Sequence, residues 1–181
     1  MTGPLTLTTP SDREIVLRRT FAAPRHLVFS AFTRPDLLRR WYGAQGWRLV
    51  ECEVDLRVGG GYRFGSRGPG GAGMTQRGVY RVVDPPATLA YTERFDDQSY
   101  PGETLITHAF TEAAGGGTTV TTTVRYPSAR ARDIALRYPM RRGVAESYQR
   151  LDTLLAGPPE AGPPSRRDGF QRTAEEGDEP Q

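Results

Sequence analysis

The feature that most constrains the fold of this chain is a succession of short, β-prone segments that leads to one long amphipathic helix. Clusters of glycine and proline, such as 59–61, 84–86 and 115–117, separate the segments. Connections this short join neighbouring strands as antiparallel hairpins. The alternating and β-branched patterns predict seven strands, over residues 13–21, 48–55, 61–67, 75–83, 88–95, 103–112 and 118–126.

Proline and serine mark the starts of the predicted helices. Pro24 and Pro35 suit the first turn of two short helices that follow the first strand. Ser128 is a suitable N-cap for a further short helix, and Pro139 interrupts that helix before a long one over 140–156. The apolar residues of the long helix recur at three- and four-residue steps, which places them on one face: Met140, Val144, Tyr148, Leu151, Leu154 and Leu155.

These elements predict a single α+β domain over residues 13–156. A seven-stranded antiparallel sheet has an apolar face that must be covered, and only the C-terminal helix is long enough to lie across it. A curved sheet around one helix leaves a space where the two diverge, and such spaces are typical ligand sites. Residues 1–12 are polar and are predicted to be a flexible arm. Residues 157–181 contain five prolines and few apolar side chains, which is typical of disorder.

The charge pattern and the lack of targeting signals narrow the range of partners. The net charge of +3 divides into +6 for residues 1–156 and −3 for the acidic tail. Arginines supply all of the positive charge but are scattered, with no basic helix or aromatic–basic stripe, so we expect no nucleic-acid partner. No stretch approaches the roughly 20 apolar residues that span a bilayer, and the N-terminus lacks a signal-peptide pattern. With a single cysteine as well, we expect a cytoplasmic protein and no membrane partner.

The sequence does not predict a metal site, a catalytic nucleophile or a phosphate-binding loop. Two histidines and one cysteine, with no paired spacing, do not make a metal site. Cys52 lies in a predicted strand, where a thiol is typically a small buried apolar group, and the chain has no Gly-x-Ser-x-Gly motif. The glycine-rich stretches 59–61 and 68–73 lead into strands, whereas phosphate-binding loops open a helix. We therefore expect no metal and no cofactor.

His108 is the most informative polar residue because it lies in the middle of a predicted strand. Alternation puts it on the same face as Ile106 and Phe110. If that face is concave, an imidazole points into an apolar cavity, where desolvation shifts its pKa and makes it a candidate acid, base or ligand contact. The alternative is a histidine on the outer face, or one whose hydrogen bonds a neighbouring threonine satisfies.

Tyr91 and Glu93 share a face by the same parity and are further candidates for catalysis or for orienting a ligand. A buried glutamate needs a partner or a proton, and we expect Arg137 or another inward arginine to supply the partner. The alternative is that strand twist turns Glu93 toward solvent. Trp41 and Trp47 flank a loop that either covers the mouth of the cavity or attaches the short helices to the sheet.

Seven short motifs are spread over residues 13–156. They read RTFAAP from Arg19, FTRPDLLRRW from Phe32, DLRVGG from Asp55, GVY from Gly78, DPPATL from Asp84, ETL from Glu103 and MRRGVAES from Met140. Together and in this order they resemble the START-like, or SRPBCC, superfamily, in its branch of bacterial homologues of the activator of the heat-shock-protein ATPase. The resemblance implies the helix-grip fold, in which the sheet encloses a long C-terminal helix and an interior cavity.

The resemblance implies several functions, because the superfamily includes lipid and hormone carriers, polyketide aromatases and cyclases, chaperone regulators and antibiotic-resistance proteins. Fold alone does not choose among them. The leading hypothesis is a protein that binds a small apolar or aromatic molecule in its cavity. The alternatives are a cofactor-free cyclase or lyase in which His108, Glu93 or Tyr91 moves a proton, a resistance protein that sequesters a toxic natural product, and a chaperone-regulator-like interaction. Some relatives dimerise, so a homodimer is also considered.

Val144 departs from the resemblance, since relatives usually carry a tryptophan after the helix glycine. The smaller side chain is expected to enlarge the cavity. We therefore predict that a ligand contacts residues from the strands, the loop and the long helix: Trp41, Trp47, Tyr62, Phe64, Tyr91, Phe95, Ile106, His108, Phe110, Thr122, Val144 and Tyr148.

Overall fold

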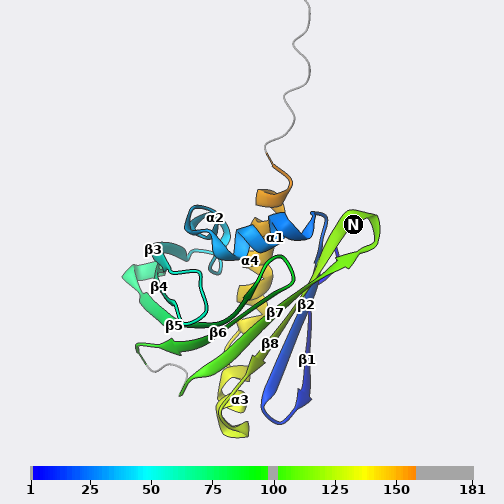
Figure 1. Ribbon diagram of the computed structural model, residues 1–181. Helices are drawn as coiled ribbons and strands as arrows, with labels where there is room; N and C mark the ends of the chain where they lie inside the picture. The colour runs from blue at the N-terminus through cyan, green and yellow to red at the C-terminus, as the bar shows by residue number, and fades with distance from the viewer. Residues whose placement is uncertain (1, 98–101, 158–181) are drawn as a thin grey trace, which may run out of the picture.

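The strands form one curved antiparallel sheet in the order β1-β2-β8-β7-β6-β5-β4-β3 (Figure 1). The computed structural model describes residues 2–97 and 102–157, and within them the sheet has eight strands. Hairpins join most sequence neighbours, as the short connections predict. The strands span Thr6–Ser11 (β1), Glu14–Phe21 (β2), Arg48–Val54 (β3), Gly61–Arg67 (β4), Gly73–Asp84 (β5), Thr88–Phe95 (β6), Thr104–Ala113 (β7) and Gly117–Arg125 (β8).

The eighth strand corrects the prediction of a flexible arm over residues 1–12. β1 pairs antiparallel with β2, with Thr6 opposite Arg18 and Thr8 opposite Val16. Its sequence is mostly exposed threonine and serine, so it carries no apolar alternation that would indicate a strand. The backbone groups of β2 would otherwise form an open edge, and the pairing satisfies them without regard to side chains. The segment 158–181, where disorder is predicted, lies outside the described residues.

The helices begin where proline and serine predict them. α1 (Arg25–Thr33) and α2 (Pro35–Trp41) follow β2, and α3 (Ala129–Leu136) and α4 (Met140–Leu155) follow β8. The Ser128 hydroxyl caps α3 by accepting a hydrogen bond from the Ala131 backbone N–H at 3.1 Å. Pro139 separates α3 from α4. Two single-turn 3₁₀ helices, Pro69–Gly71 and Ala114–Gly116, lie in connections.

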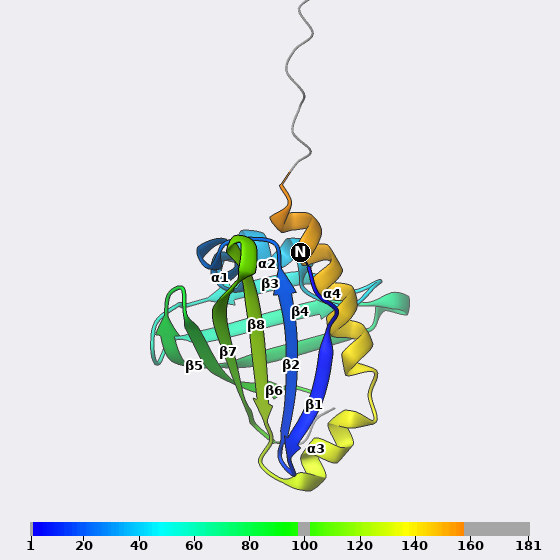
Figure 2. The same ribbon diagram turned by 90° about the vertical axis from the view of Figure 1, so that its right-hand side faces the viewer.

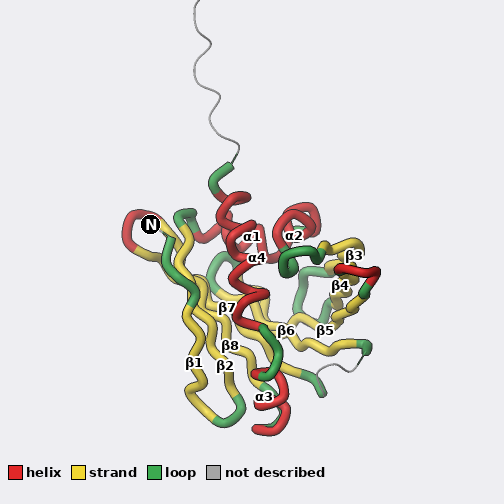
Figure 3. The backbone as a smooth tube through the Cα atoms, turned by 180° about the vertical axis from the view of Figure 1, so that it is seen from behind, coloured by secondary structure: helices red, strands yellow, loops and turns green. Residues whose placement is uncertain are grey.

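The α4 helix lies across the concave side of the sheet. Seen from behind, it runs between β1 and β2 on one side and β3, β4 and β5 on the other (Figure 3). The view turned by 90° shows the C-terminal end of α4 at the same end of the domain as α1 and α2, and α3 at the opposite end (Figure 2). This arrangement confirms the predicted helix-grip fold.

The C-terminal half of α4 makes the tight contact. The Tyr148 ring meets Phe21 of β2 edge-on at 5.2 Å between ring centroids, and lies 6.2 Å from Phe32 and 6.0 Å from Trp41. Leu151, one turn later, has no exposed surface. Arg19 of β2 forms an ion pair with Asp152 of α4, and its guanidinium lies over the rings of Phe21 and Tyr148. Apolar packing and one half-buried ion pair therefore fix this half of the helix to the sheet.

β5 and β6 approach each other closely at Gly78. A side chain at Gly78 would meet the backbone oxygen of Thr92 at 1.6 Å, so only glycine allows the two strands to approach this closely. The register then shifts between Tyr80 and Val82, which indicates a bulge. The same Thr92 oxygen accepts a hydrogen bond from the Tyr62 hydroxyl at 3.1 Å, which fixes that ring on the concave face.

Leu151→Ala tests whether this contact dominates the stability of the domain. The substitution removes a fully buried side chain between helix and sheet, so we expect the free energy of unfolding in urea to fall by about 2–5 kcal/mol. Gln149→Ala, at an exposed position of the same helix, is the matched control and should change it by less than about 0.5 kcal/mol. Equal effects of the two substitutions would show that the helix does not depend on this face.

Candidate ligand-binding cavity

A cavity of about 450 Å³ lies between the concave face of the sheet and the N-terminal half of α4. Strands β4 to β8 supply one wall, and α4 and the loop after α2 supply the other. The cavity exists because this half of α4 presents the small side chains of Gly143 and Val144 to the sheet. On the following turns of the helix, the same face carries the larger side chains of Tyr148 and Leu151. Its volume is within the roughly 300–1,000 Å³ that small-molecule sites occupy.

The structure brings nearly all of the predicted site residues to this cavity. Glu93 and every predicted ligand contact except Phe110 line it. The faces of β6 and β7 that carry these residues are therefore on the concave side of the sheet. The predicted residues that line the cavity are Trp41, Trp47, Tyr62, Phe64, Tyr91, Glu93, Phe95, Ile106, His108, Thr122, Val144 and Tyr148.

Phe110, the remaining predicted ligand contact, lies on the same strand face but is not among the residues that line the cavity. Its ring is almost fully buried and packs against Phe29 and Phe32, each at 5.3 Å between centroids. The reason is its position near the end of β7 that α1 covers, where helix side chains occupy the concave face. Parity gives the face of a residue, but it does not say how far the covering helices extend.

His108 is held by two hydroxyl groups. Its Nδ1 lies 2.8 Å from Thr122 Oγ1, and its Nε2 lies 3.0 Å from the Tyr91 hydroxyl. Thr122 is directly opposite His108 in the β7–β8 pair, so the first contact follows from the register. Burial lowers the pKa of His108 to about 3. The imidazole is therefore neutral near pH 7, with one ring nitrogen donating and the other accepting, and it holds the Tyr91 hydroxyl in place.

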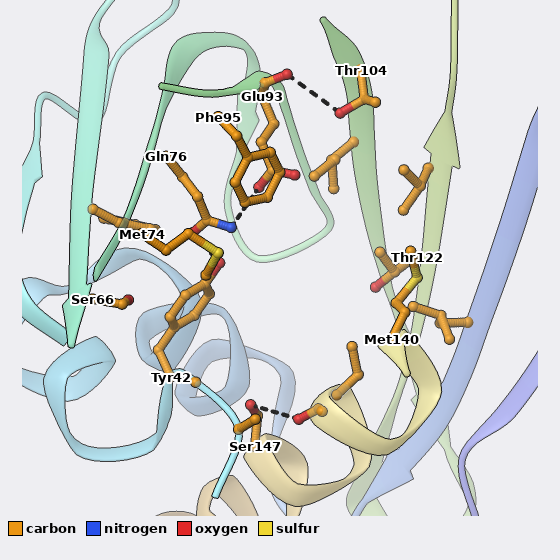
Figure 4. A pocket seen from close by; sticks show the side chains of 18 of the residues that line it. Tyr42, Ser66, Met74, Gln76, Glu93, Phe95, Thr104, Thr122, Met140 and Ser147 are labelled. Carbon is orange, nitrogen blue, oxygen red and sulfur yellow. Dashed lines mark hydrogen bonds between the residues drawn. The ribbon is translucent and has the colours of Figure 1, made fainter. Parts of the chain in front are cut away.

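Glu93 belongs to a second polar chain on the cavity wall. Its Oε2 accepts a hydrogen bond from Gln76 Nε2 at 3.3 Å, and Gln76 Oε1 accepts one from the Tyr42 hydroxyl at 2.7 Å. Figure 4 shows these three side chains together with Phe95 on one side of the cavity and Thr122 and Met140 on the other. The Thr104 hydroxyl also donates to the backbone oxygen of Glu93 at 3.5 Å. The polar groups thus come from β5, β6, β7 and the end of α2.

The partner of Glu93 differs from the expected one. Arg137 is exposed, and among the described residues no arginine lines the cavity. Because an amide replaces the expected cation, nothing offsets the cost of burying the charge, and burial raises the pKa of Glu93 to about 7. Burial likewise raises the pKa values of the facing phenols Tyr42, Tyr62 and Tyr91, so these remain neutral.

Gln76 and Tyr42 are the site residues that sequence reasoning missed. Gln76 pairs with Phe64 on one neighbouring strand and Phe95 on the other, so its side chain shares their concave face. A strand assignment alone does not supply this register. Tyr42 follows the last residue of α2 and reaches the cavity because of where that helix packs. Ser66, Met74 and Met140 also line the cavity, although none of them was predicted to contact a ligand.

The two tryptophans have different positions. Trp41 is almost fully buried, and its indole N–H donates to the Ala31 backbone oxygen at 2.9 Å, so it attaches α2 to α1 while touching the cavity. Trp47 ends a loop that α4 holds: Glu146 accepts from the Gln45 backbone N–H at 2.8 Å, and Arg150 donates to the Trp47 oxygen at 3.4 Å. The loop therefore forms a fixed part of the cavity wall.

A metal site, a reactive thiol and a membrane-spanning helix are the other features to consider in the part of the chain that the structure describes. Residues 2–97 and 102–157 contain no group of three histidine, cysteine or acidic side chains that could hold a metal ion. Cys52 is buried, as its strand position predicts, and burial raises the pKa of its thiol. No helix within these residues is both long and apolar enough to cross a membrane.

A sheet that encloses a C-terminal helix and leaves a cavity beside it defines a START-like domain of the helix-grip type. Within this class, the chain belongs to the family described as "Activator of Hsp90 ATPase homolog 1-like protein", whose model matches residues 22–156. The predicted resemblance is thereby confirmed.

Solved structures agree with this assignment. A protein from Rhodobacter sphaeroides is 32% identical, with a TM-score of 0.80 over 85% of this chain and 99% of that one. Protein Ms6760 from Mycobacterium smegmatis is 24% identical, with a TM-score of 0.75 over 86% and 99%. The AHSA1 protein from Silicibacter pomeroyi is 20% identical, with a TM-score of 0.65 over 79% and 97%. The last two show the shared fold alone. No curated protein matches the sequence.

Glu93→Gln should remove a pH dependence from the stability of the domain. The folded state holds the Glu93 proton up to a pKa of about 7, against an ordinary value of 4.5. Between these values the folded state binds more protons than the unfolded state, so its stability falls as pH rises. At pH 8 we expect Glu93→Gln to be more stable than the wild type by on the order of 1–3 kcal/mol, and at pH 4.5 nearly equal. The measurement is urea unfolding, with exposed Glu53→Gln as the control. A stability difference that does not change with pH would contradict the assignment.

His108 should keep a neutral imidazole well below pH 6. Because burial lowers its pKa to about 3, its ring ¹⁵N chemical shifts should stay constant from pH 8 to pH 4.5. The resonances are assigned by their loss in His108→Gln. A titration midpoint between pH 6 and 7 would show that solvent reaches the ring and that the two hydroxyls do not hold it.

Proposed function

We propose that this protein binds one small, mainly apolar or aromatic molecule in the cavity between the sheet and α4. The observation that carries the proposal is the cavity itself: about 450 Å³, walled mainly by aromatic and aliphatic side chains. Apolar walls supply affinity through the hydrophobic effect, and a few fixed polar groups supply orientation. The Tyr42–Gln76–Glu93 and Tyr91–His108–Thr122 chains are such groups.

The polar groups support binding because their positions are fixed before a ligand arrives. Gln76, His108 and Thr122 are buried and hydrogen-bonded, so little side-chain entropy remains to be lost on binding. Carriage and sequestration of a toxic product would use the same cavity and differ in the rate of release. The family name refers to activation of the Hsp90 ATPase. The cavity favours small-molecule binding over that role, because docking on another protein does not need an interior space.

Glu93 favours one second candidate, a cofactor-free cyclase or lyase. A carboxyl group with a pKa of about 7 can both accept and return a proton near neutral pH, which general acid–base catalysis requires. Tyr91 lies two residues away on the same strand face and could orient a carbonyl oxygen. His108 is a poor base in this scheme, because its pKa of about 3 leaves it with little affinity for a proton.

Native mass spectrometry of protein purified from its own host tests the proposal and separates the two candidates. Binding predicts a co-purifying molecule of defined mass in the wild type. If the protein only binds, any molecule that Glu93→Gln retains should have the same mass as the molecule in the wild type, even where less of it is bound. If Glu93 is a catalytic base, the variant should retain the unreacted substrate, and the bound mass should differ from the product mass in the wild type. A wild-type protein that carries no molecule and binds no apolar dye would overturn the proposal.

Val144→Trp should close the cavity without unfolding the domain. The indole would project into the space that Val144 leaves beside Gly143. We expect the affinity for the neutral fluorescent dye N-phenyl-1-naphthylamine to fall at least about tenfold, or 1.4 kcal/mol. Gln149→Trp adds the same group at an exposed position of α4 and should leave dye binding unchanged. If both variants bind the dye as the wild type does, the binding site lies elsewhere.

A further inference from the structure

Among the described residues that line the cavity, two carry an acidic or basic side chain, Glu93 and His108. His108 is neutral, so Glu93 is the one of the two that can carry a charge near neutral pH. Every other lining residue is apolar, aromatic or an uncharged polar residue. The ion pairs between described residues join surface and helix groups, and none of them includes Glu93. The cavity therefore contains a carboxyl group and no internal cation to pair with its charge.

One oxygen of this carboxyl group is left for a ligand. Oε2 accepts from the Gln76 amide, and the hydrogen bonds between described residues bring no donor to Oε1. Among those residues, Nε of Arg19 is the one side-chain polar atom that is fully buried and has no hydrogen-bond partner. Oε1 of Glu93 also has no partner, so it is not fully buried, and a group in the cavity can reach it. A group that enters the cavity and donates a hydrogen bond meets this atom.

Aromatic rings continue the cavity wall beside Glu93. Tyr62 lies 4.9 Å from Phe64 and 5.1 Å from Tyr91 between ring centroids, and Phe64 lies 5.3 Å from Tyr42. These rings come from β4, from β6 and from the residue after α2, and they line the cavity together with the carboxyl group. The faces of aromatic rings attract cations. A positive charge placed near Glu93 is therefore stabilised by the carboxylate and lies in a part of the wall that aromatic rings complete.

We propose that the molecule bound in this cavity carries a basic amine, whose ammonium group donates to Glu93 while its apolar or aromatic body lies against the remaining wall. The inference rests on the proposed function and specifies the class of ligand. A neutral hydroxyl or amide would leave the half-buried carboxylate without a counter-charge, and an anionic ligand would be repelled by it. An ammonium group offsets the charge and forms a charge-assisted hydrogen bond, which is stronger than a neutral one.

Three naphthalene compounds of nearly equal shape test this inference: the amine 2-(1-naphthyl)ethylamine, the alcohol 2-(1-naphthyl)ethanol and the carboxylate 1-naphthaleneacetate. Their affinities are measured at pH 8 by displacement of N-phenyl-1-naphthylamine from the wild type, Glu93→Gln and the exposed control Glu53→Gln. We expect the wild type and Glu53→Gln to bind the amine at least about tenfold more tightly than the alcohol, which corresponds to 1.4 kcal/mol. The acetate should bind most weakly. Glu93→Gln should bind amine and alcohol equally, with its affinity for the alcohol unchanged.

The outcomes separate this inference from the proposed function. Equal binding of amine and alcohol by the wild type overturns the amine inference and leaves a general apolar site. The same holds if the dye binds and none of the three compounds displaces it. Failure of the dye itself to bind overturns both. Should Glu93→Gln not fold, ¹³C NMR of the wild-type Glu93 carboxyl gives an independent result: the amine should lower its pKa and the alcohol should not. An unchanged titration in the presence of saturating amine also contradicts the inference.

Discussion

The structure depends on how the C-terminal half of α4 docks into the curved sheet. Tyr148 contacts β2, α1 and α2 at once, and Leu151 beside it is fully enclosed. The Arg19–Asp152 pair adds a polar link to β2, and the Arg19 side chain is mostly buried under the helix. Because α4 runs across the concave face, this contact both closes the domain and sets the angle of the helix.

The cavity follows from an uneven distribution of side-chain size along that same helix. Where α4 carries Tyr148 and Leu151 it reaches the sheet, and where it carries Gly143 and Val144 it leaves about 450 Å³ between the two. The stable half and the open half therefore belong to one rigid element. A ligand site built in this way can keep its shape when empty, because the contact that stabilises the fold lies one helical turn away from it.

The two ionisable residues of the cavity respond to burial in opposite directions. Burial disfavours a charged group, so it lowers the pKa of His108 to about 3 and raises that of Glu93 to about 7. His108 becomes a fixed hydrogen-bonding group between Thr122 and Tyr91. Among the described residues that line the cavity, Glu93 is the one whose charge can change near neutral pH. We therefore expect the Glu93 carboxyl group to determine both the selectivity of the cavity for a cation and any acid–base chemistry within it.

Much of the fold and much of the cavity wall could be predicted from local pattern, and the errors have a common cause. Strand parity grouped His108 with Ile106 and Tyr91 with Glu93, because alternation is a property of each strand by itself. The structure shows that both groups line the cavity. Phe110 has the same parity as His108 but lies outside the cavity, because its surroundings depend on where α1 ends. Gln76 was missed because its neighbours are set by the register of three strands.

The sequence by itself determined the strands that carry an apolar alternation, the helix boundaries at proline and serine, and the apolar face of α4, since each depends on residues close together in the chain. Only the tertiary structure decided that β1 completes the sheet, that an amide faces Glu93 in place of an arginine, and that the space beside Val144 stays open. These features depend on contacts between distant segments. Their geometry is set by how closely whole strands and helices pack, which no short stretch of sequence specifies.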